Sequence, residues 1–443
     1  MITLKISLIF LICIWSLDVS VCVFQNATDP PVAPVPDKPE NSTGSPPAPG
    51  PVSSNEAGNS TGSPPAPGPV SSNEAENSTG SPPAPGPVSS NEPENSTGSP
   101  PAPGPVSSYK PHKFLISPAQ PAGVPTIFAK QVDLKQQATY FNSLISQHKL
   151  DQMAIDLAKL TCEQRMQVKV EYTNAYSRSI EQDIDGKTKK TFMRLLYALI
   201  QPMPELMAAT IDWSITQKQD FLYVSLICTT PADLLTQIAN TYAAKNNKKL
   251  VDAIMQNMKD VDGQDFLSDI VNAVTGFESM VQTRPNNTIS EDLIQTQVNY
   301  IPQAQGNCSE KDNPDLYKFM GGASFAQIAA VVKAFQQKTS LSAASQIRQF
   351  CNGILSEAYS RIVIFAEDPV SYWTTEVYNS MGYGKTIDRG LTVAVLYRSE
   401  IDLASIRDSF KTTYHNDLVD FIKSHCSETY EKVMENIVSG VQE

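Results

Sequence analysis

Apolar residues follow a helical period in the C-terminal three quarters of the chain and follow no period before it. From about Lys110 onward they recur at i, i+3, i+4 and i+7, the spacing of one helix face. The stretch from Met153 to Tyr176 shows this period well, and further helices are expected over 191–202, 232–246, 324–338 and 417–440. Two short apolar runs, RIVIFA and LTVAVLY, cannot be assigned by period, but no convincing alternating strand occurs. The pattern therefore predicts an all-α fold.

A longer internal period divides the helical part. The segments EYTNAYSRSI, NTYAAKNNKKL, KAFQQKTSLSA and TTYHNDLVDFI each carry an aromatic residue where one amphipathic helix gives way to the next. These aromatic residues are Tyr176, Tyr242, Phe335 and Tyr414, which lie 66, 93 and 79 residues apart. Such a period predicts four helical units of roughly 70–80 residues that stack and share their cores.

The first 22 residues have the organisation of a secretory signal peptide. Lys5 precedes an apolar run from Ile6 to Trp15, and small residues follow around Cys22. This run is too short for a membrane anchor. No later stretch reaches spanning length, and the end, SGVQE, lacks a GPI-type tail. We therefore expect a secreted, extracellular protein, either released or associated with a surface.

Residues 23–108 are rich in proline, serine and glycine, and ENSTGSPPAPGPVSSNEA recurs in them with a period of 18. Such a segment cannot bury a core, so a disordered stalk of polyproline II character is expected. Each repeat carries an Asn-Ser-Thr acceptor, which favours a glycosylated stalk over an unmodified spacer. Glycosylation is expected at Asn26, Asn41, Asn59, Asn77, Asn95, Asn286 and Asn307.

Charge and cysteine usage narrow the function. The net charge is −12, and residues 23–107, with eight acids and one lysine, leave −5 for residues 108–443. The helical part therefore has no broad basic surface for nucleic acid. Five cysteines follow the signal peptide, too few for a disulfide scaffold. Three of them are expected to be small buried residues: Cys162, Cys228 and Cys426. A bridge between the other two, Cys308 and Cys351, is left open.

Catalytic motifs are missing from the sequence. The chain has four histidines, none in a His-Glu-x-x-His spacing, and it has no Gly-x-Ser-x-Gly. The Gly-Lys-Thr at 384–386 is not a P-loop, because Asn379 stands where the first glycine is required and a helical pattern precedes it. We therefore predict that the protein is not an enzyme and has no small-molecule substrate.

Several segments resemble annexin repeats. Tyr397–Met434 is similar to the fourth repeat of an annexin, CEQRMQVKVEYTNAYSRSIEQDI to the first, LICTTPADLLTQIANTY to the second and SFAQIAAVVKAFQQK, more faintly, to the third. The resemblance covers about residues 128–440 and implies four repeats of five helices in a curved disc. Its convex face would carry loops that bind membranes through calcium. The expected repeats are 128–200, 201–276, 277–368 and 369–443.

The resemblance also implies where calcium would bind. Annexins hold the ion with main-chain carbonyls of a Met, Gly-x-Gly-Thr loop between the first two helices of a repeat and one carboxylate about forty residues later, which suits a hard cation. In repeat 4, Lys385 interrupts the loop and His425 occupies the carboxylate position. The residues that match the loop are Met381, Gly382, Gly384 and Thr386.

The other repeats depart further from that pattern. The loops ISQH and ITQK of repeats 1 and 2 have no glycine, and Lys187 stands at the carboxylate position of repeat 1. The FMGGAS segment, with Gly321 and Gly322, matches the loop of repeat 3, where Glu357 is the one candidate for the aligned acid. Repeat 2 alone has an acid-rich segment, a candidate calcium site or a solvated turn: Asp260, Asp262 and Asp265. Calcium binding is expected to be weak or absent.

Lysines replace acids and threonines in the loops that the resemblance assigns to the convex face. They either bind anionic lipid directly or are ordinary solvated lysines. The set is Lys187, Lys189, Lys190, Lys218, Lys385 and Lys423. Two functions remain open at this point: an annexin-like protein that binds phospholipid surfaces, and an extracellular structural or host-interaction protein that binds proteins or glycans.

Overall fold

The computed structural model describes residues 123–258, 263–304, 308–381 and 388–440, apart from the side chains of Lys190 and Thr191. All regular secondary structure in these ranges is helical. None of the helices in them is long and apolar enough to span a bilayer. The predicted signal peptide and stalk, with the five stalk sequons, lie outside the described residues.

The helices of the first two repeats follow a common order, and we denote the five helices of a repeat A to E. Repeat 1 contains α2 (Leu134–Ser146), α3 (Leu150–Leu157), α4 (Cys162–Tyr176), α5 (Ile180–Ile184) and α6 (Lys190–Ile200). Repeat 2 contains α7 (Met203–Thr216), α8 (Asp220–Thr229), α9 (Ala232–Asn246), α10 (Leu250–Asn257) and α11 (Gln264–Thr275).

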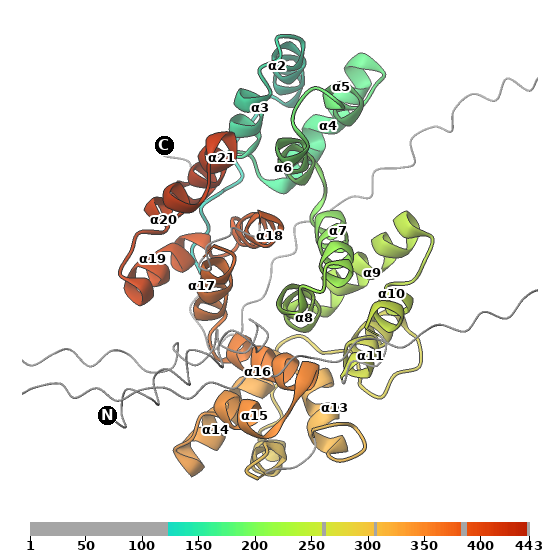
Figure 1. Ribbon diagram of the computed structural model, residues 1–443, viewed down its shortest axis with the longest axis vertical. Coiled ribbons are helices and arrows are strands. Elements are labelled where there is room, and N and C mark those ends of the chain that lie inside the picture. Colours follow the sequence, from blue (N-terminus) through green and yellow to red (C-terminus); the bar gives the residue numbers. More distant parts are fainter. Residues whose placement is uncertain (1–122, 259–262, 305–307, 382–387, 441–443) are drawn as a thin grey trace, which may run out of the picture. The chain divides into compact units, whose positions relative to one another are not determined.

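Repeats 3 and 4 keep this order after a longer connector (Figure 1). Repeat 3 contains α12 (Glu291–Gln297) with η1 (Val298–Tyr300), α13 (Pro314–Gly322), α14 (Phe325–Thr339), α15 (Ala343–Phe350) and α16 (Gly353–Glu367). Repeat 4 contains α17 (Pro369–Asn379), α18 (Asp388–Arg398), α19 (Leu403–Tyr414), α20 (Leu418–His425) and α21 (Glu428–Ser439). The two unassigned apolar runs of the sequence, RIVIFA and LTVAVLY, are thus helical.

Local sequence signals set many of the helix ends. Thr161 with Gln164 and Ser179 with Gln182 form capping boxes, in which each side chain bonds the other residue's backbone N–H. Asp368 accepts two backbone N–H bonds at the start of α17, whose first residue is proline. The Thr161 box also explains why the periodic stretch Met153–Tyr176 is two helices, α3 and α4, and not one.

Each C helix ends in the same way and buries the same aromatic position. The residue after α4, α9, α14 and α19 is left-handed in every repeat: Ser177, Asn247, Ser340 and His415. Steps from 177 to 247, 247 to 340 and 340 to 415 give repeat lengths of 70, 93 and 75 residues. Five residues before each left-handed position stands an aromatic side chain that is at most 3% exposed: Tyr172, Tyr242, Phe335 and Phe410.

This register corrects the sequence-based assignment of two aromatic residues. Tyr176 and Tyr414 end their helices and are only partly buried, so they are not the equivalents of Tyr242 and Phe335. The error arose because α4 and α19 each carry a second aromatic residue near their last turn. Which of the two points into the core depends on the helix rotation, which the tertiary packing decides.

The repeats pack in two pairs, and the contacts within each pair are reciprocal (Figure 1). In the pair of repeats 2 and 3, the E helix of each repeat contacts the B helix of the other: α11 with α13, and α16 with α8. The pair of repeats 1 and 4 does the same through α6 with α18 and α21 with α3. Helix α18 also contacts α7, so that repeats 1, 2 and 4 meet around α18.

A network of buried polar side chains joins three helices at these contacts. Arg361 is 1% exposed; its Nε donates to Glu357 and its Nη1 to Glu376, both at 2.6 Å. The hydroxyl of Tyr372 at the start of repeat 4 lies 2.5 Å from that of Ser225 in repeat 2. Burying a charge is tolerated when it is paired and hydrogen-bonded, so this network fixes the relative position of α8, α16 and α17.

Candidate functional site

The A–B and D–E connections of the repeats come together, and they form the candidate site. The hydroxyl of Tyr430, just after the D–E connection of repeat 4, donates to the carbonyl of Asp388, just after the A–B connection, at 2.9 Å. D–E connections of paired repeats also meet: Lys189 Nζ lies 3.9 Å from Glu428 Oε1. A Cβ on Gly263 would lie 2.9 Å from the backbone nitrogen of Leu355, which shows the same approach between repeats 2 and 3.

The A–B connections of repeats 1 and 2 are tight helix-ending turns. His148 and Lys218 adopt left-handed conformations, with φ of 57° and 53°. Their N–H groups donate to the carbonyls of Ile145 and Ile215, and the next residues donate to those of Leu144 and Ser214. This is the Schellman motif, in which backbone N–H groups of the turn donate to the last carbonyls of the helix.

These two turns lack the glycines of the annexin calcium loop. Calcium takes six to eight oxygen ligands, and several helix-end carbonyls here already accept backbone N–H groups: those of Leu144, Ile145, Ser214 and Ile215. In repeat 1, Lys187 is exposed near the D–E connection. The nearby Asp183 accepts from Tyr172 and from Arg178. Among the described residues, no three acid, histidine or cysteine side chains are placed to share a metal ion.

Repeat 3 joins its A–B and D–E connections covalently. Cys308, before α13, and Cys351, between α15 and α16, form a disulfide with a Cα–Cα distance of 5.4 Å. The hydroxyl of Tyr359 donates to the Cys308 carbonyl at 2.9 Å and anchors the link in the core. The structure therefore decides the pairing that the sequence left open. These are the two connections between which the annexin resemblance places calcium.

The FMGGAS segment is not the A–B loop of repeat 3. Gly321 and Gly322 are the last residues of α13, the B helix, and lead to α14. A Cβ on Gly321 would lie 2.5 Å from a methyl carbon of Val281, so this glycine lets the connector pack closely on α13. The two glycines of FMGGAS suggested a loop, but in the structure Gly321 lies in a helix and allows close packing.

In repeat 4 most of the predicted loop lies outside the described residues, namely Gly382, Gly384, Lys385 and Thr386. Met381 is fully buried. At the predicted carboxylate position, the His425 ring stacks on Phe421 with centroids 4.0 Å apart, and its Nδ1 lies 2.8 Å from the Phe421 carbonyl. Of the repeat 2 acids, Asp265 is in the first turn of α11, whereas Asp260 and Asp262 are outside the described residues.

The predicted lysines have different surroundings. Lys187 and Lys218 are exposed. The Lys189 side chain is 81% exposed despite its long contact with Glu428. Lys423 forms an ion pair with Glu435 at 3.0 Å, so its charge is locally balanced. Lys190 begins α6, and its side chain is outside the described part of the structure.

Sequence reasoning overlooked other basic residues near these connections. His148, the last residue of the ISQH segment, and the adjacent Lys149 are exposed in the A–B turn of repeat 1. Arg194 on α6 and Arg389 on α18 line one cavity. A signal for Arg389 was available, since it follows the Gly-Lys-Thr segment closely, but nothing in the sequence pairs it with Arg194.

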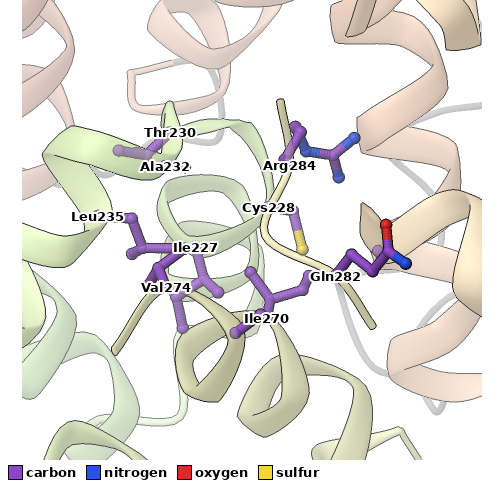
Figure 2. Close-up of a pocket in the computed structure, with 11 residues that line it drawn as sticks. Ile227, Cys228, Thr230, Ala232, Leu235, Ile270, Val274, Gln282 and Arg284 are labelled. Carbon is purple, nitrogen blue, oxygen red and sulfur yellow. The ribbon is translucent and has the colours of Figure 1, made fainter. Parts of the chain in front are cut away.

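A second, smaller cavity serves the packing of the connector (Figure 2). It lies between α8, α9, α11 and residues 282–284, and its volume of about 10 Å³ is at most that of one water. Arg284 beside it donates to the carbonyls of Ala323 and Met320 and lies over the Phe325 ring. Burial raises the pKa of the Cys228 thiol to about 12, so the thiol stays protonated and unreactive.

Together, the fold and the connections define a four-repeat, all-helical protein whose candidate ligand surface is built from interhelical turns. The annexin family model matches residues 154–199 and 380–437, within repeats 1 and 4. Annexin A13 of Mus musculus is 22% identical over 287 residues, covering 63% of this chain and 86% of the relative. Annexin A6 of Mus musculus is 24% identical over 284 residues, covering 62% and 40%.

Solved structures agree. Annexin III superposes with a TM-score of 0.62 at 20% identity, covering 72% of this chain and 99% of the other. A calcium-bound annexin (Sm)1 gives a TM-score of 0.62 at 16% identity, covering 72% and 94%. The chain therefore has the annexin fold, as the sequence predicted, and two of its segments match the annexin family model.

Proposed function

We propose that the protein is exported and binds anionic phospholipid surfaces through its A–B and D–E connections, with calcium contributing little or nothing. The observation that carries the proposal is the pair of closed A–B turns in repeats 1 and 2, where exposed basic residues stand and helix-end carbonyls are engaged. A surface that cannot recruit lipid phosphate through a bound ion can still attract it through fixed positive charge.

Charge sets the expected strength of this binding. Lys187, Lys189 and Lys218 are exposed at the connections, with Lys149 beside them. Each such residue near an anionic membrane contributes roughly 1 kcal/mol, so a few of them give weak adhesion. Because these charges are solvated, physiological salt should screen most of the attraction.

A second candidate is an extracellular interaction protein that binds proteins or glycans. The connector between repeats 2 and 3, with the start of α12, favours it, because this segment exposes several large apolar side chains: Phe277, Met280, Ile289 and Leu293. Its sequon residue Asn286 is also exposed. The sequon at Asn307 falls in the A–B connection of repeat 3, and Asn307 is outside the described residues. Single exposed apolar residues are common on protein surfaces, so this alternative carries less weight.

The deciding experiment is sedimentation of the purified full chain with phosphatidylserine-containing vesicles. Low and physiological salt are compared, each with millimolar calcium or with chelator. We expect pelleting that does not need calcium and that falls with salt. Strictly calcium-dependent pelleting would contradict the closed-turn argument, and no pelleting at either salt concentration would leave the interaction protein as the better hypothesis.

A charge-reversal variant assigns the surface. Lys187→Glu/Lys189→Glu/Lys218→Glu should abolish vesicle binding. The matched control reverses three exposed lysines within helices, Lys318→Glu/Lys333→Glu/Lys411→Glu, and therefore has the same net charge. If both variants lost binding equally, overall charge and not this surface would be responsible. N-terminal sequencing of the secreted protein tests export and cleavage near Cys22.

A further inference from the structure

A cavity of about 200 Å³ lies where repeats 1, 2 and 4 meet. Helices α6, α7 and α18 form most of its wall, and Tyr430 of α21 completes it. Asp388 and Arg389 are the first residues of α18, and Tyr430 is the third residue of α21. The cavity therefore lies next to the A–B and D–E connections of repeat 4, on the side of the proposed lipid-binding surface.

Arg389 is held in place by groups that leave part of its guanidinium available. Its Nη1 donates to the Ala209 carbonyl at 3.2 Å, and its Cζ lies 5.2 Å from the centroid of the Trp213 ring. Its Nε is buried and finds no hydrogen-bond acceptor within the described part of the chain. Because Nε is shielded from solvent, a ligand oxygen would bond this guanidinium through its other N–H groups.

The second arginine increases the positive potential of the cavity. Arg194 lines the same wall from α6 and is exposed to solvent. Burial and the charge of Arg194 lower the pKa of Arg389, whereas the carboxylate of Asp212, outside the cavity lining, raises it. Neither arginine forms an ion pair within 4.0 Å in the described ranges. One lining carboxylate, Asp388, leaves the lining side chains with a formal charge of +1.

Hydroxyls also line the cavity, but they are bonded to one another and to the backbone. Those of Thr392 and Tyr430 lie 2.9 Å apart in the wall, and Tyr430 donates its hydrogen to the Asp388 carbonyl. Burial raises the pKa of Tyr430 well above its usual value, so this hydroxyl stays protonated. The donors for a phosphate are therefore the two arginines, whose guanidinium groups donate in pairs to its oxygens.

We propose that this cavity binds a small phosphate-bearing anion between Arg194 and Arg389. Its volume is below the roughly 300–1,000 Å³ of sites for drug-sized ligands, so it fits a single phosphate group and not a nucleotide. The anion could be free phosphate or the phosphate of a lipid headgroup, and the headgroup alternative rests on the proposed function.

Equilibrium dialysis of the full chain against radiolabelled inorganic phosphate tests the cavity without any membrane. Arg389→Gln and Arg194→Gln should each weaken phosphate binding roughly tenfold or more, since each removes charge-assisted hydrogen bonds. Arg389→Lys should restore only part of the affinity, because it keeps the charge and loses the planar donor pair. Lys333→Gln, with the same charge change on α14, should leave binding unaltered.

The melting temperature of every variant is measured to verify that the variant is folded. Arg194 is exposed, so Arg194→Gln should melt like the wild type and keeps the test valid if Arg389→Gln unfolds. No phosphate binding by the wild type, or equal binding by wild type and both glutamine variants, would overturn the proposal.

Vesicle sedimentation of the same variants distinguishes the two sources of phosphate. If phosphate and phosphatidylserine vesicles both depend on Arg194 and Arg389, the ligand is a lipid headgroup. If only phosphate binding depends on these arginines, the ligand is a soluble phosphate, and vesicle binding relies on other residues, such as Lys187, Lys189 and Lys218. Wild-type protein that binds phosphate but no vesicles would reject the proposed function and still support the cavity site.

Discussion

Reduction of the Cys308–Cys351 disulfide is expected to destabilise the protein by about 4 kcal/mol. The two cysteines are 43 residues apart in sequence, and the bridge closes a loop that contains α13, α14 and α15. Cross-linking a loop of this length removes roughly 13 cal/mol/K of chain entropy from the unfolded state, which gives about 4 kcal/mol at 25 °C. Both cysteines are at most 4% exposed, so strong reductant or partial unfolding is needed to break the bond.

The assay compares oxidised and reduced wild-type protein, because this comparison changes no packed atom except the bond. Urea unfolding gives the free energy difference, and hydrogen exchange of the peptides that contain the A–B and D–E connections of repeat 3 locates it. A lower unfolding midpoint with faster exchange in these peptides is the expected result. Peptide mapping must show that the oxidised sample contains the bridge.

Cys308→Ala/Cys351→Ala serves as the control for side effects of the reductant, because its unfolding should not respond to reductant at all. The free thiols of Cys162 and Cys228 remain in this variant. Equal midpoints of oxidised and reduced wild type, with complete reduction confirmed by mass, would refute the loop-entropy argument.

Three further variants test the packing and electrostatics. Phe410→Ala should cost about 3–5 kcal/mol of unfolding free energy because the ring is fully buried, whereas Tyr414→Ala should cost less than half of that; similar urea midpoints for the two would contradict the repeat register. Gly321→Ala should cost about 1–3 kcal/mol, since the new Cβ meets Val281, and a wild-type midpoint would mean that the connector moves aside freely. Burial, chiefly, raises the pKa of Glu400, so the folded state holds its proton to higher pH than the unfolded state does, and this carboxyl reduces stability as pH rises above its unfolded pKa. Glu400→Gln should therefore gain stability relative to the wild type as pH rises above the unfolded pKa of a glutamate, about 4.3, in urea titrations, and a constant difference would argue against the raised pKa.

Local sequence determined much of this protein. The period of 3.6 residues, with capping residues such as Thr161 and Asp368, is sufficient to predict helices, because caps and amphipathic faces act within a few residues of each other. The sequence also shows that the segments with His148 and Lys218 have no glycine, and at these positions the structure has tight helix-ending turns. The resemblance to annexins was visible for the same reason, since it rests on contiguous motifs.

Other features depend on contacts between distant segments. Gly321 was assigned to a loop because glycine is common there, and only the approach of Val281 shows that it serves helix packing. Cys308 and Cys351 could pair only if two connections of repeat 3 met. Arg194 and Arg389 belong to repeats 1 and 4 and share a cavity because α6 and α18 pack together. Such contacts between distant segments depend on the packing of the whole core, so they can be recognised only when the tertiary structure is known.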